Sequence, residues 1–198
     1  MPKRLAFFIA CLLLSACSQI PVHPTAPPDP YPDVAMETTL GTFVVQLDRK
    51  RAPLTVENFL NYVNTGFYNG TLFHRVVPGF VIQGGGYTTA YVQKKTLVPI
   101  PNESGNGLEN LRGSIAMARD AAPHSADAQF YLNLVDNRKL DPRPDRWGYA
   151  VFGKVVQGMD VADKIAAVPT SKVGPFDQDA PLTPVVIRKA WVLPKSTD

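Results

Sequence analysis

Cysteine is almost missing from this chain of 198 residues, and the part that would fold has none. The two cysteines, Cys11 and Cys17, both lie within the first seventeen residues. A disulfide, a thiolate nucleophile and a cysteine-bound zinc are therefore excluded for the rest of the chain.

A large excess of charge of one sign is missing as well. Lys plus Arg number 20 against 17 for Asp plus Glu, which gives a formal net charge of +3. Lys3 and Arg4 lie in a segment that we expect to be removed, and this leaves about +1 on the mature chain. A near-neutral domain has no electrostatic footprint for nucleic acid, so we expect no nucleic-acid partner.

The residue patterns of common catalytic sites are missing too. No pair of carboxylates is placed for acid–base chemistry, and no nucleophile has a base at a recognisable spacing. Glycines 84–86 are not followed by a helix pattern or a lysine, which argues against a phosphate-binding loop. We expect His74 to be a hydrogen-bonded structural residue and His124 to be solvated. We expect no metal and no cofactor.

The first residues have the layout of a secretory signal. A basic start precedes an apolar run from Leu5 to Leu14, which is too short for a typical membrane-spanning helix. Its end, Leu14-Ser15-Ala16-Cys17, resembles the lipobox of bacterial lipoproteins. The resemblance implies that residues 1–16 are a signal peptide and that Cys17 carries lipid, with an ordinary secretory signal as the alternative. It also implies a place in the bacterial cell envelope facing the periplasm, and Ser18 favours the outer membrane.

A proline-rich stretch separates this segment from the body of the chain. Residues 18–33 contain six prolines and almost no periodic apolar pattern. Such a stretch is typical of an extended, polyproline-like tether. We therefore assign residues 17–33 to the lipidated cysteine and its tether, residues 34–194 to one folded domain and residues 195–198 to a tail.

The body has the pattern of many short strands and two helices. Pro53 and the spacing of Val56, Phe59, Leu60 and Val63 predict a helix over 53–65, and residues 159–167 predict a second. Closing the strands on themselves would remove exposed edges, so we expect a mainly β fold: a closed eight-stranded antiparallel barrel capped by the two helices. The expected strands are 34–38, 42–47, 71–76, 79–84, 112–118, 128–133, 150–156 and 184–193.

Polar side chains on neighbouring strands predict a shallow cleft. The period of two places Phe73 and Arg75 on one side of a strand, and Val81 and Gln83 on one side of the next. Gln129 and Tyr131 likewise share a side. An arginine and two glutamines among aromatic rings have the make-up of a ligand site, although Arg75 alone could equally be a surface arginine.

Four sequence runs, in fixed order, resemble the bacterial cyclophilin-type peptidyl-prolyl cis–trans isomerases. They are FHRVVPGFVIQGG (73–85), GSIAMAR (113–119), AQFYLNL (128–134) and GYAVFGKVVQGMDVADKI (148–165). The resemblance covers residues 34–194 and implies the same barrel. It also implies an activity that breaks no bond: uncatalysed rotation about an Xaa-Pro bond takes tens to hundreds of seconds, and the catalyst need only stabilise the twisted amide.

The resemblance assigns roles to ten residues. Arg75 is the catalytic group, a permanently charged donor to the prolyl nitrogen or the adjacent carbonyl. Gln83 bonds to the substrate backbone, and the other substrate-binding positions are Phe80, Val81, Ala118, Arg119, Gln129, Tyr131, Leu140 and Tyr149.

Three positions depart from the family pattern. Val81 stands where methionine is frequent, and Tyr131 replaces a usual phenylalanine and adds a hydroxyl that needs a partner. Lys139 lies where the family has an aromatic residue that helps to bind cyclosporin, so we expect weak inhibition by that compound.

The sequence therefore predicts a monomeric isomerase that acts on unfolded or extended proline-containing polypeptides of the envelope and assists their folding. The alternative is a proline-binding chaperone or interaction module with little turnover, which the three departures would suit.

Overall fold

The computed structural model describes residues 28–195. The predicted signal peptide, Cys17 and most of the predicted tether lie outside the described residues. The strands are β1 (Asp33–Thr38), β2 (Gly41–Leu47), β3 (Thr71–Val77), β4 (Val81–Thr88), β5 (Ser114–Met117), β6 (Phe130–Asn133), β7 (Val151–Gln157), β8 (Thr170–Val173), β9 (Phe176–Pro181) and β10 (Val186–Val192). The helices are α1 (Pro53–Asn64), α2 (Met159–Ala166) and a short 3-10 helix, η1 (Arg138–Leu140).

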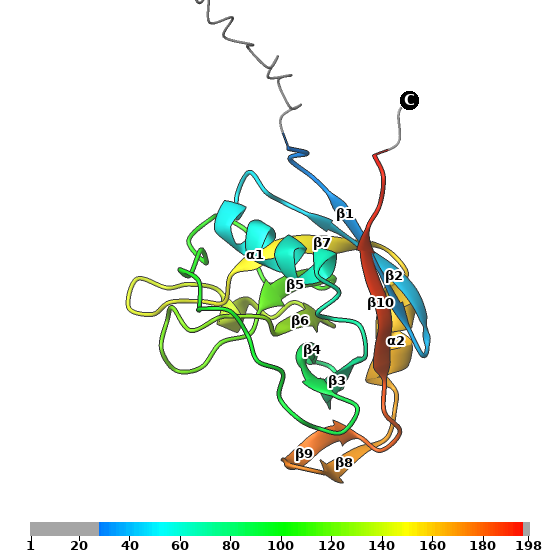
Figure 1. The fold of residues 1–198 in the computed structure, drawn as a ribbon. Helices are drawn as coiled ribbons and strands as arrows, with labels where there is room; N and C mark the ends of the chain where they lie inside the picture. Colours follow the sequence, from blue (N-terminus) through cyan, green and yellow to red (C-terminus); the bar gives the residue numbers. More distant parts are fainter. Residues whose placement is uncertain (1–27, 196–198) are drawn as a thin grey trace, which may run out of the picture.

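Eight of the strands close into a barrel, as predicted (Figure 1). The order around the barrel is β1-β10-β3-β4-β6-β5-β7-β2, and every neighbouring pair is antiparallel. Because the last strand pairs with the first, no barrel strand presents a free edge for pairing with another chain.

The two helices close the barrel at opposite ends. The β1–β2 turn lies against α2, where Val161 of α2 approaches Gly41. The other end of β2 leads into α1, which begins at Pro53, a residue suited to the first turn because it lacks the N–H that a first turn leaves unused. Gly66, with φ +68°, follows α1 in the left-handed conformation that commonly ends a helix.

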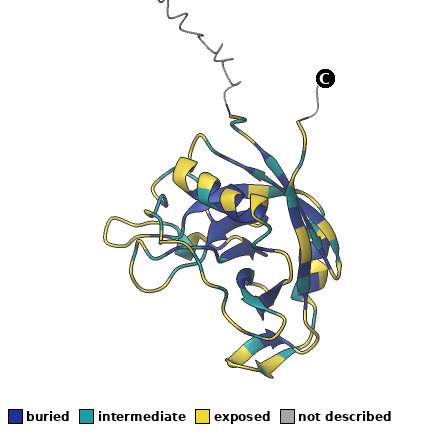
Figure 2. Cartoon of the chain, viewed as in Figure 1, coloured by how far each residue is buried: buried dark blue, intermediate teal, exposed yellow. Residues whose placement is uncertain are grey.

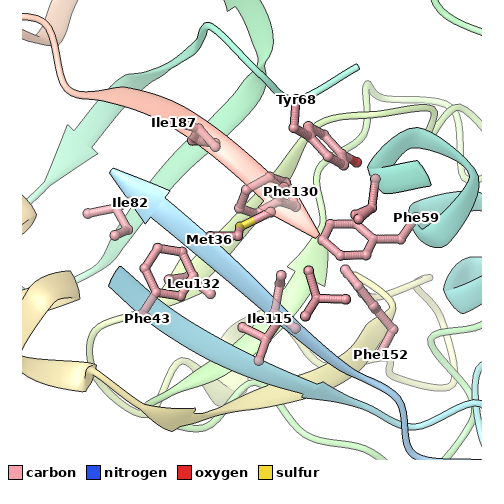
Figure 3. Packing of buried hydrophobic residues seen from close by; sticks show 14 of the residues in the cluster. Met36, Phe43, Phe59, Tyr68, Ile82, Ile115, Phe130, Leu132, Phe152 and Ile187 are labelled. Atoms are coloured by element: carbon pink, nitrogen blue, oxygen red, sulfur yellow. The ribbon is translucent and has the colours of Figure 1, made fainter. Parts of the chain in front are cut away.

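The barrel interior is filled by aromatic and branched side chains (Figure 3). Phe59 from α1 packs edge-on against Phe130 of β6 at 5.7 Å between ring centroids, and its ring lies 5.1 Å from that of Phe152 of β7. Figure 2 shows the contrast between this buried interior and the exposed outer face of α1. The core joins α1 to strands that are distant in sequence, so the helix fixes the positions of β6 and β7.

A two-stranded hairpin, β8–β9, stands outside the barrel and was not predicted. It packs beside β3 through Phe176, whose ring stacks on His74 at 5.3 Å and meets Tyr87 edge-on at 4.9 Å. The hairpin therefore rests on the strand that carries Arg75.

The alternation predicted for β3 is wrong at one step. Phe73 is 1% exposed and belongs to the barrel core, whereas Arg75 is partly exposed on the outside. The pairing of β3 with β4 shifts register between these two residues, and the irregularity places Phe73 and Val76 inside with two residues between them.

Within residues 28–195, no helix combines the length and the apolar character needed to cross a membrane.

Candidate active site

A row of paired residues crosses the outer face of four neighbouring strands. Arg75 on β3 pairs with Gln83 on β4, Gln83 pairs with Tyr131 on β6, and Tyr131 pairs with Ala116 on β5. With about 4.8 Å between strands, the row spans about 14 Å. Strand register alone therefore brings together side chains from four separate parts of the sequence.

Three residues of this row, Arg75, Gln83 and Tyr131, line a hollow of about 120 Å³. Its floor belongs to a small apolar cluster outside the barrel, which includes the buried Val81, Ala116, Tyr131 and Val151. The residues that line the hollow are Arg75, Phe80, Val81, Gln83, Ala118, Arg119, Tyr131, Leu140 and Tyr149. These are nine of the ten site residues that the sequence predicts.

Gln129 is the tenth predicted residue, and it is not among the residues that line the hollow. Its side-chain Oε1 accepts a hydrogen bond from Nε2 of Gln83 at 3.1 Å. Gly86 allows this arrangement, because a Cβ at position 86 would come within 2.6 Å of Cγ of Gln129. Gln129 thus holds Gln83 in place, and the structure does not put it on the lining.

The guanidinium of Arg75 faces this hollow and is only loosely paired. The Arg75 side chain is 38% exposed, and its Nε lies 3.8 Å from Oδ2 of Asp179 on β9. Its Cζ lies 5.9 Å from the centre of the Phe80 ring, and Nζ of Lys139 lies 4.7 Å from the same centre. Two cations therefore flank the aromatic wall of the hollow, and most of the donor capacity of Arg75 is left for a ligand.

The hydroxyl of Tyr131 has the hydrogen-bond partner that the sequence predicts it needs. It donates to Oδ1 of the fully buried Asn110 at 2.8 Å, and burial holds the pKa of Tyr131 well above its usual range. Asn133 also donates to Asn110 Oδ1, at 3.2 Å, and Asn137 joins Asn133 to the backbone carbonyl of Phe80 with bonds of 2.8 and 2.9 Å. This buried asparagine network fixes both the floor and one wall, and no local sequence pattern predicts it.

Arg119 closes the other side of the hollow. Its Cζ lies 4.6 Å from the centre of the Tyr149 ring. Its guanidinium donates to the carbonyl oxygens of Gly148 at 3.2 Å and Trp147 at 3.0 Å. The cation thus fastens the wall segment that contains Tyr149.

Comparison with known proteins identifies this arrangement. Residues 33–192 match the family model "Cyclophilin type peptidyl-prolyl cis-trans isomerase/CLD". The chain belongs to this family.

Relatives from several bacteria are similar over most of their length. The chain is 52% identical over 162 residues to peptidyl-prolyl cis-trans isomerase A of Dickeya dadantii, covering 82% of this chain and 85% of the relative. It is 48% identical over 187 residues to an isomerase of Acinetobacter baylyi, covering 94% of each. It is 50% identical to isomerase B of Escherichia coli over 80% of this chain and 98% of the relative.

Solved structures confirm the fold of this cyclophilin. A cyclophilin-type isomerase of Cryptosporidium parvum superposes with a TM-score of 0.69 at 22% sequence identity, over 84% of this chain and 99% of that one. The family and the names of its relatives support peptidyl-prolyl cis–trans isomerase activity.

The predicted histidine roles are partly correct. His124 is exposed, as expected, and its Nδ1 accepts a hydrogen bond from the backbone N–H of Asn102 at 3.0 Å. His74 is buried in a structural position, as expected; its Nδ1 has no hydrogen-bond partner, while hydrogen bonding with the Leu72 backbone and the Gln129 side chain acts on its pKa.

Sequence reasoning missed Asp179 and Asn110. Asp179 lies on the unpredicted hairpin, and Asn110 lies in a long loop between β4 and β5. Neither position carries a local pattern, because each reaches the site only through tertiary contacts.

Proposed function

We propose that Arg75 catalyses rotation about Xaa-Pro bonds by donating a hydrogen bond to the twisted amide. Rotation removes the conjugation of the peptide nitrogen, which then accepts a hydrogen bond, and the guanidinium remains charged at all working pH values. Preorganised donors of this kind contribute a few kcal/mol. The observation that carries the proposal is a half-free guanidinium beside an apolar hollow of about 120 Å³.

The size of the hollow suits one small ring. Pockets for drug-sized molecules usually measure about 300–1,000 Å³, several times larger than this one. Phe80, Leu140 and Tyr131 provide apolar walls that hold the prolyl ring, while Gln83 bonds to the substrate backbone. The ring is thereby held still while the preceding residue turns.

Asp179 restrains the guanidinium from the hairpin side. It is one of two non-glycine residues with positive φ within residues 28–195, at +60°. The other is Tyr91, in the loop after β4, whose ring packs against Gly174 and Phe176 of the hairpin. Aspartate tolerates this conformation better than most residues, but at some cost. In this conformation the Asp179 carboxylate lies 3.8 Å from Nε of Arg75. That is near enough to orient the guanidinium without occupying its N–H donors.

Replacement of Arg75 tests this mechanism. The R75A protein should keep its fold and lose at least about a hundredfold in kcat/KM, and R75K should recover little because it lacks the planar fork. Line-shape or exchange NMR on a proline peptide measures the rate directly. R188A is a matched control, because Arg188 is also a strand arginine with a loose ion pair, 3.8 Å from Glu37. Wild-type rates in R75A would overturn the mechanism.

We further propose that the enzyme acts on unfolded polypeptides of the bacterial cell envelope, assists their folding and is held there by lipid on Cys17. The signal-like start, the Leu14-Ser15-Ala16-Cys17 sequence and the prolines after it support this proposal. The chain is pinned to the barrel from Asp29, whose carbonyl accepts from Nη1 of Arg49 at 2.7 Å.

Fractionation tests the anchor. The wild-type protein should sediment with membranes, at the density of the outer membrane, and C17A should be soluble or retain an uncleaved signal. S18D should move the lipidated protein toward the inner membrane if the sorting analogy holds. A soluble wild-type protein, or mass spectrometry without acyl groups on Cys17, would contradict the proposal while leaving isomerase activity untouched.

A further inference from the structure

The segment between Leu140 and Tyr149 forms a loop with a closed base and a closed tip. At its base the N–H of Tyr149 donates to the carbonyl of Leu140 at 3.0 Å. Both residues line the hollow of about 120 Å³ beside Arg75, which we call the proline hollow. At its tip Arg143 and Arg146 bond to each other through both backbone pairs, at 2.8 and 3.0 Å. Gly148 is required for this closure, because a Cβ there would lie 2.4 Å from the nitrogen of Pro142.

The tip of this loop lines a second hollow, of about 400 Å³. The hollow is lined by Ser104, Gly105, Pro142, Arg143, Pro144, Asp145, Arg146 and Trp147. Trp147 is 46% exposed, which leaves a large part of an indole ring in contact with solvent. An exposed tryptophan that shares this lining with two prolines is a surface suited to the binding of another polypeptide.

Arg119 connects the two hollows. It lines the proline hollow, and its guanidinium donates to the carbonyls of Trp147 and Gly148, at the rim of the second hollow. The two hollows lie close together. Leu140 lines the proline hollow and Arg143 lines the second hollow, and the three residues that separate them span about 10 Å when extended. A substrate chain gripped at its proline can therefore reach the second hollow with its third or fourth residue on one side.

The second hollow has an excess of positive charge. Neither Arg143 nor Arg146 has a carboxylate within ion-pair distance among the described residues, and Arg146 donates instead to the carbonyls of Lys139 and Asp141. Asp145 is the one acidic residue of the lining. Two cations against one anion, with Arg119 at the shared wall, favour an acidic side chain.

We propose that the second hollow is a subsite for the substrate chain, and that it selects an acidic residue three to four positions from the proline. The proposal rests on the proposed function, because it requires the first hollow to hold that proline. The indole of Trp147 supplies contact area for the chain, and Arg143 and Arg146 supply the charge preference.

Matched peptides test this subsite. A short blocked tetrapeptide reports the proline hollow alone. Longer peptides place two glutamates, or two lysines, three and four residues before or after the proline. Exchange NMR at low salt measures kcat/KM for each peptide. We expect the glutamate peptide of one orientation to exceed its lysine counterpart by about threefold, and 0.5 M salt to abolish the difference.

Two variants assign the effect to the second hollow. R143E should reverse the preference, because the exposed Arg143 side chain makes no hydrogen bond or ion pair among the described residues. W147A should lower the kcat/KM of the extended peptide relative to that of the short peptide, because the indole contact is lost. The backbone carbonyl of residue 147 remains, so Arg119 stays anchored. W191A is the matched control, because Trp191 lies on β10 beside Lys189 and away from both hollows.

The outcomes separate the two proposals. Equal kcat/KM for glutamate and lysine peptides, with normal turnover of the tetrapeptide, would overturn the subsite and leave the isomerase intact. A preference that persists unchanged in R143E would also overturn it. Failure to turn over any peptide would instead reject the proposed function. Circular dichroism confirms that each variant is folded.

Discussion

Mild acid should weaken this fold through one residue, His74. Its side chain is buried with 6% exposure, and its Nδ1 has no hydrogen-bond partner. Burial, aided by the neighbouring Arg75 cation, lowers the pKa of His74 from 6.5 to about 4. The folded protein therefore holds this imidazole neutral at pH values where the unfolded chain would protonate it.

The size of the effect follows from the two pKa values. Between pH 6.5 and 4 the unfolded state takes up a proton that the folded state does not, so the free energy of unfolding falls as pH falls through this window. One pKa unit corresponds to about 1.4 kcal/mol, so the fall from 6.5 to about 4 gives a loss of about 3 kcal/mol. Above pH 6.5 the contribution is fully present, and below pH 4 the loss levels off.

Urea denaturation at half-unit intervals from pH 4 to pH 8 measures this slope. The H74F variant should keep the ring packing against Phe176 and Tyr87 and lose most of the dependence between pH 6.5 and 4.5. H124F is the control, because His124 is exposed and should leave the slope unchanged. Identical slopes in wild type and H74F would refute the reasoning.

Three further changes test the surroundings of the site. D179N keeps a residue that tolerates positive φ but removes the charge beside Arg75; we expect kcat to fall about two- to fivefold with KM and stability nearly unchanged, and an unchanged kcat would rule out the positioning role. N110L leaves the buried Tyr131 hydroxyl without a partner, so it should lower the free energy of unfolding by about 2 kcal/mol. In a protein that already carries Tyr131→Phe, the same change should cost only about 1 kcal/mol. Denaturation curves in which the two losses simply add would contradict the network. Cyclosporin should inhibit the wild-type enzyme weakly and K139W more strongly, and a low-nanomolar inhibition constant for the wild type would show that Lys139 is not the obstacle.

The barrel could be predicted because its signals are local. The two helices have their apolar residues at helical spacing, and the observed α1 and α2 each end one residue before the predicted boundary. The β4 strand runs on to Thr88, four residues past its predicted end, because Thr88 still pairs with Thr71 of β3 beyond the three glycines 84–86, which offer no strand pattern.

The hairpin could not be predicted because its pairing is carried by polar residues. All four residues of β8 are at least partly exposed, and only the last two residues of β9 are buried. Its position depends on Phe176 meeting His74 and Tyr87, two rings that lie about 90 to 100 residues earlier in the chain. A contact of that kind leaves no periodic trace in either segment.

The site could be predicted mainly from residue types in an order of motifs that resembles the family, and the structure shows the physical basis of their meeting. Arg75, Gln83 and Tyr131 share one cross-strand row, and this required the register shift that separates Arg75 from Phe73. Alternation alone would have put those two residues on the same face. The irregularity in β3 is therefore what turns the arginine outward.

The pairing of β1 with β10 also determines how this molecule responds to force. Val34 lies opposite Val192, so the polypeptide enters and leaves the barrel at neighbouring points, at the top of Figure 1. Pulling those two points apart would peel the ladder one rung after another, the weakest geometry for a sheet. In an optical-tweezers experiment, pulling on the two ends should therefore unzip β1 from β10. The force needed should be far lower than when the same two strands are sheared along their length.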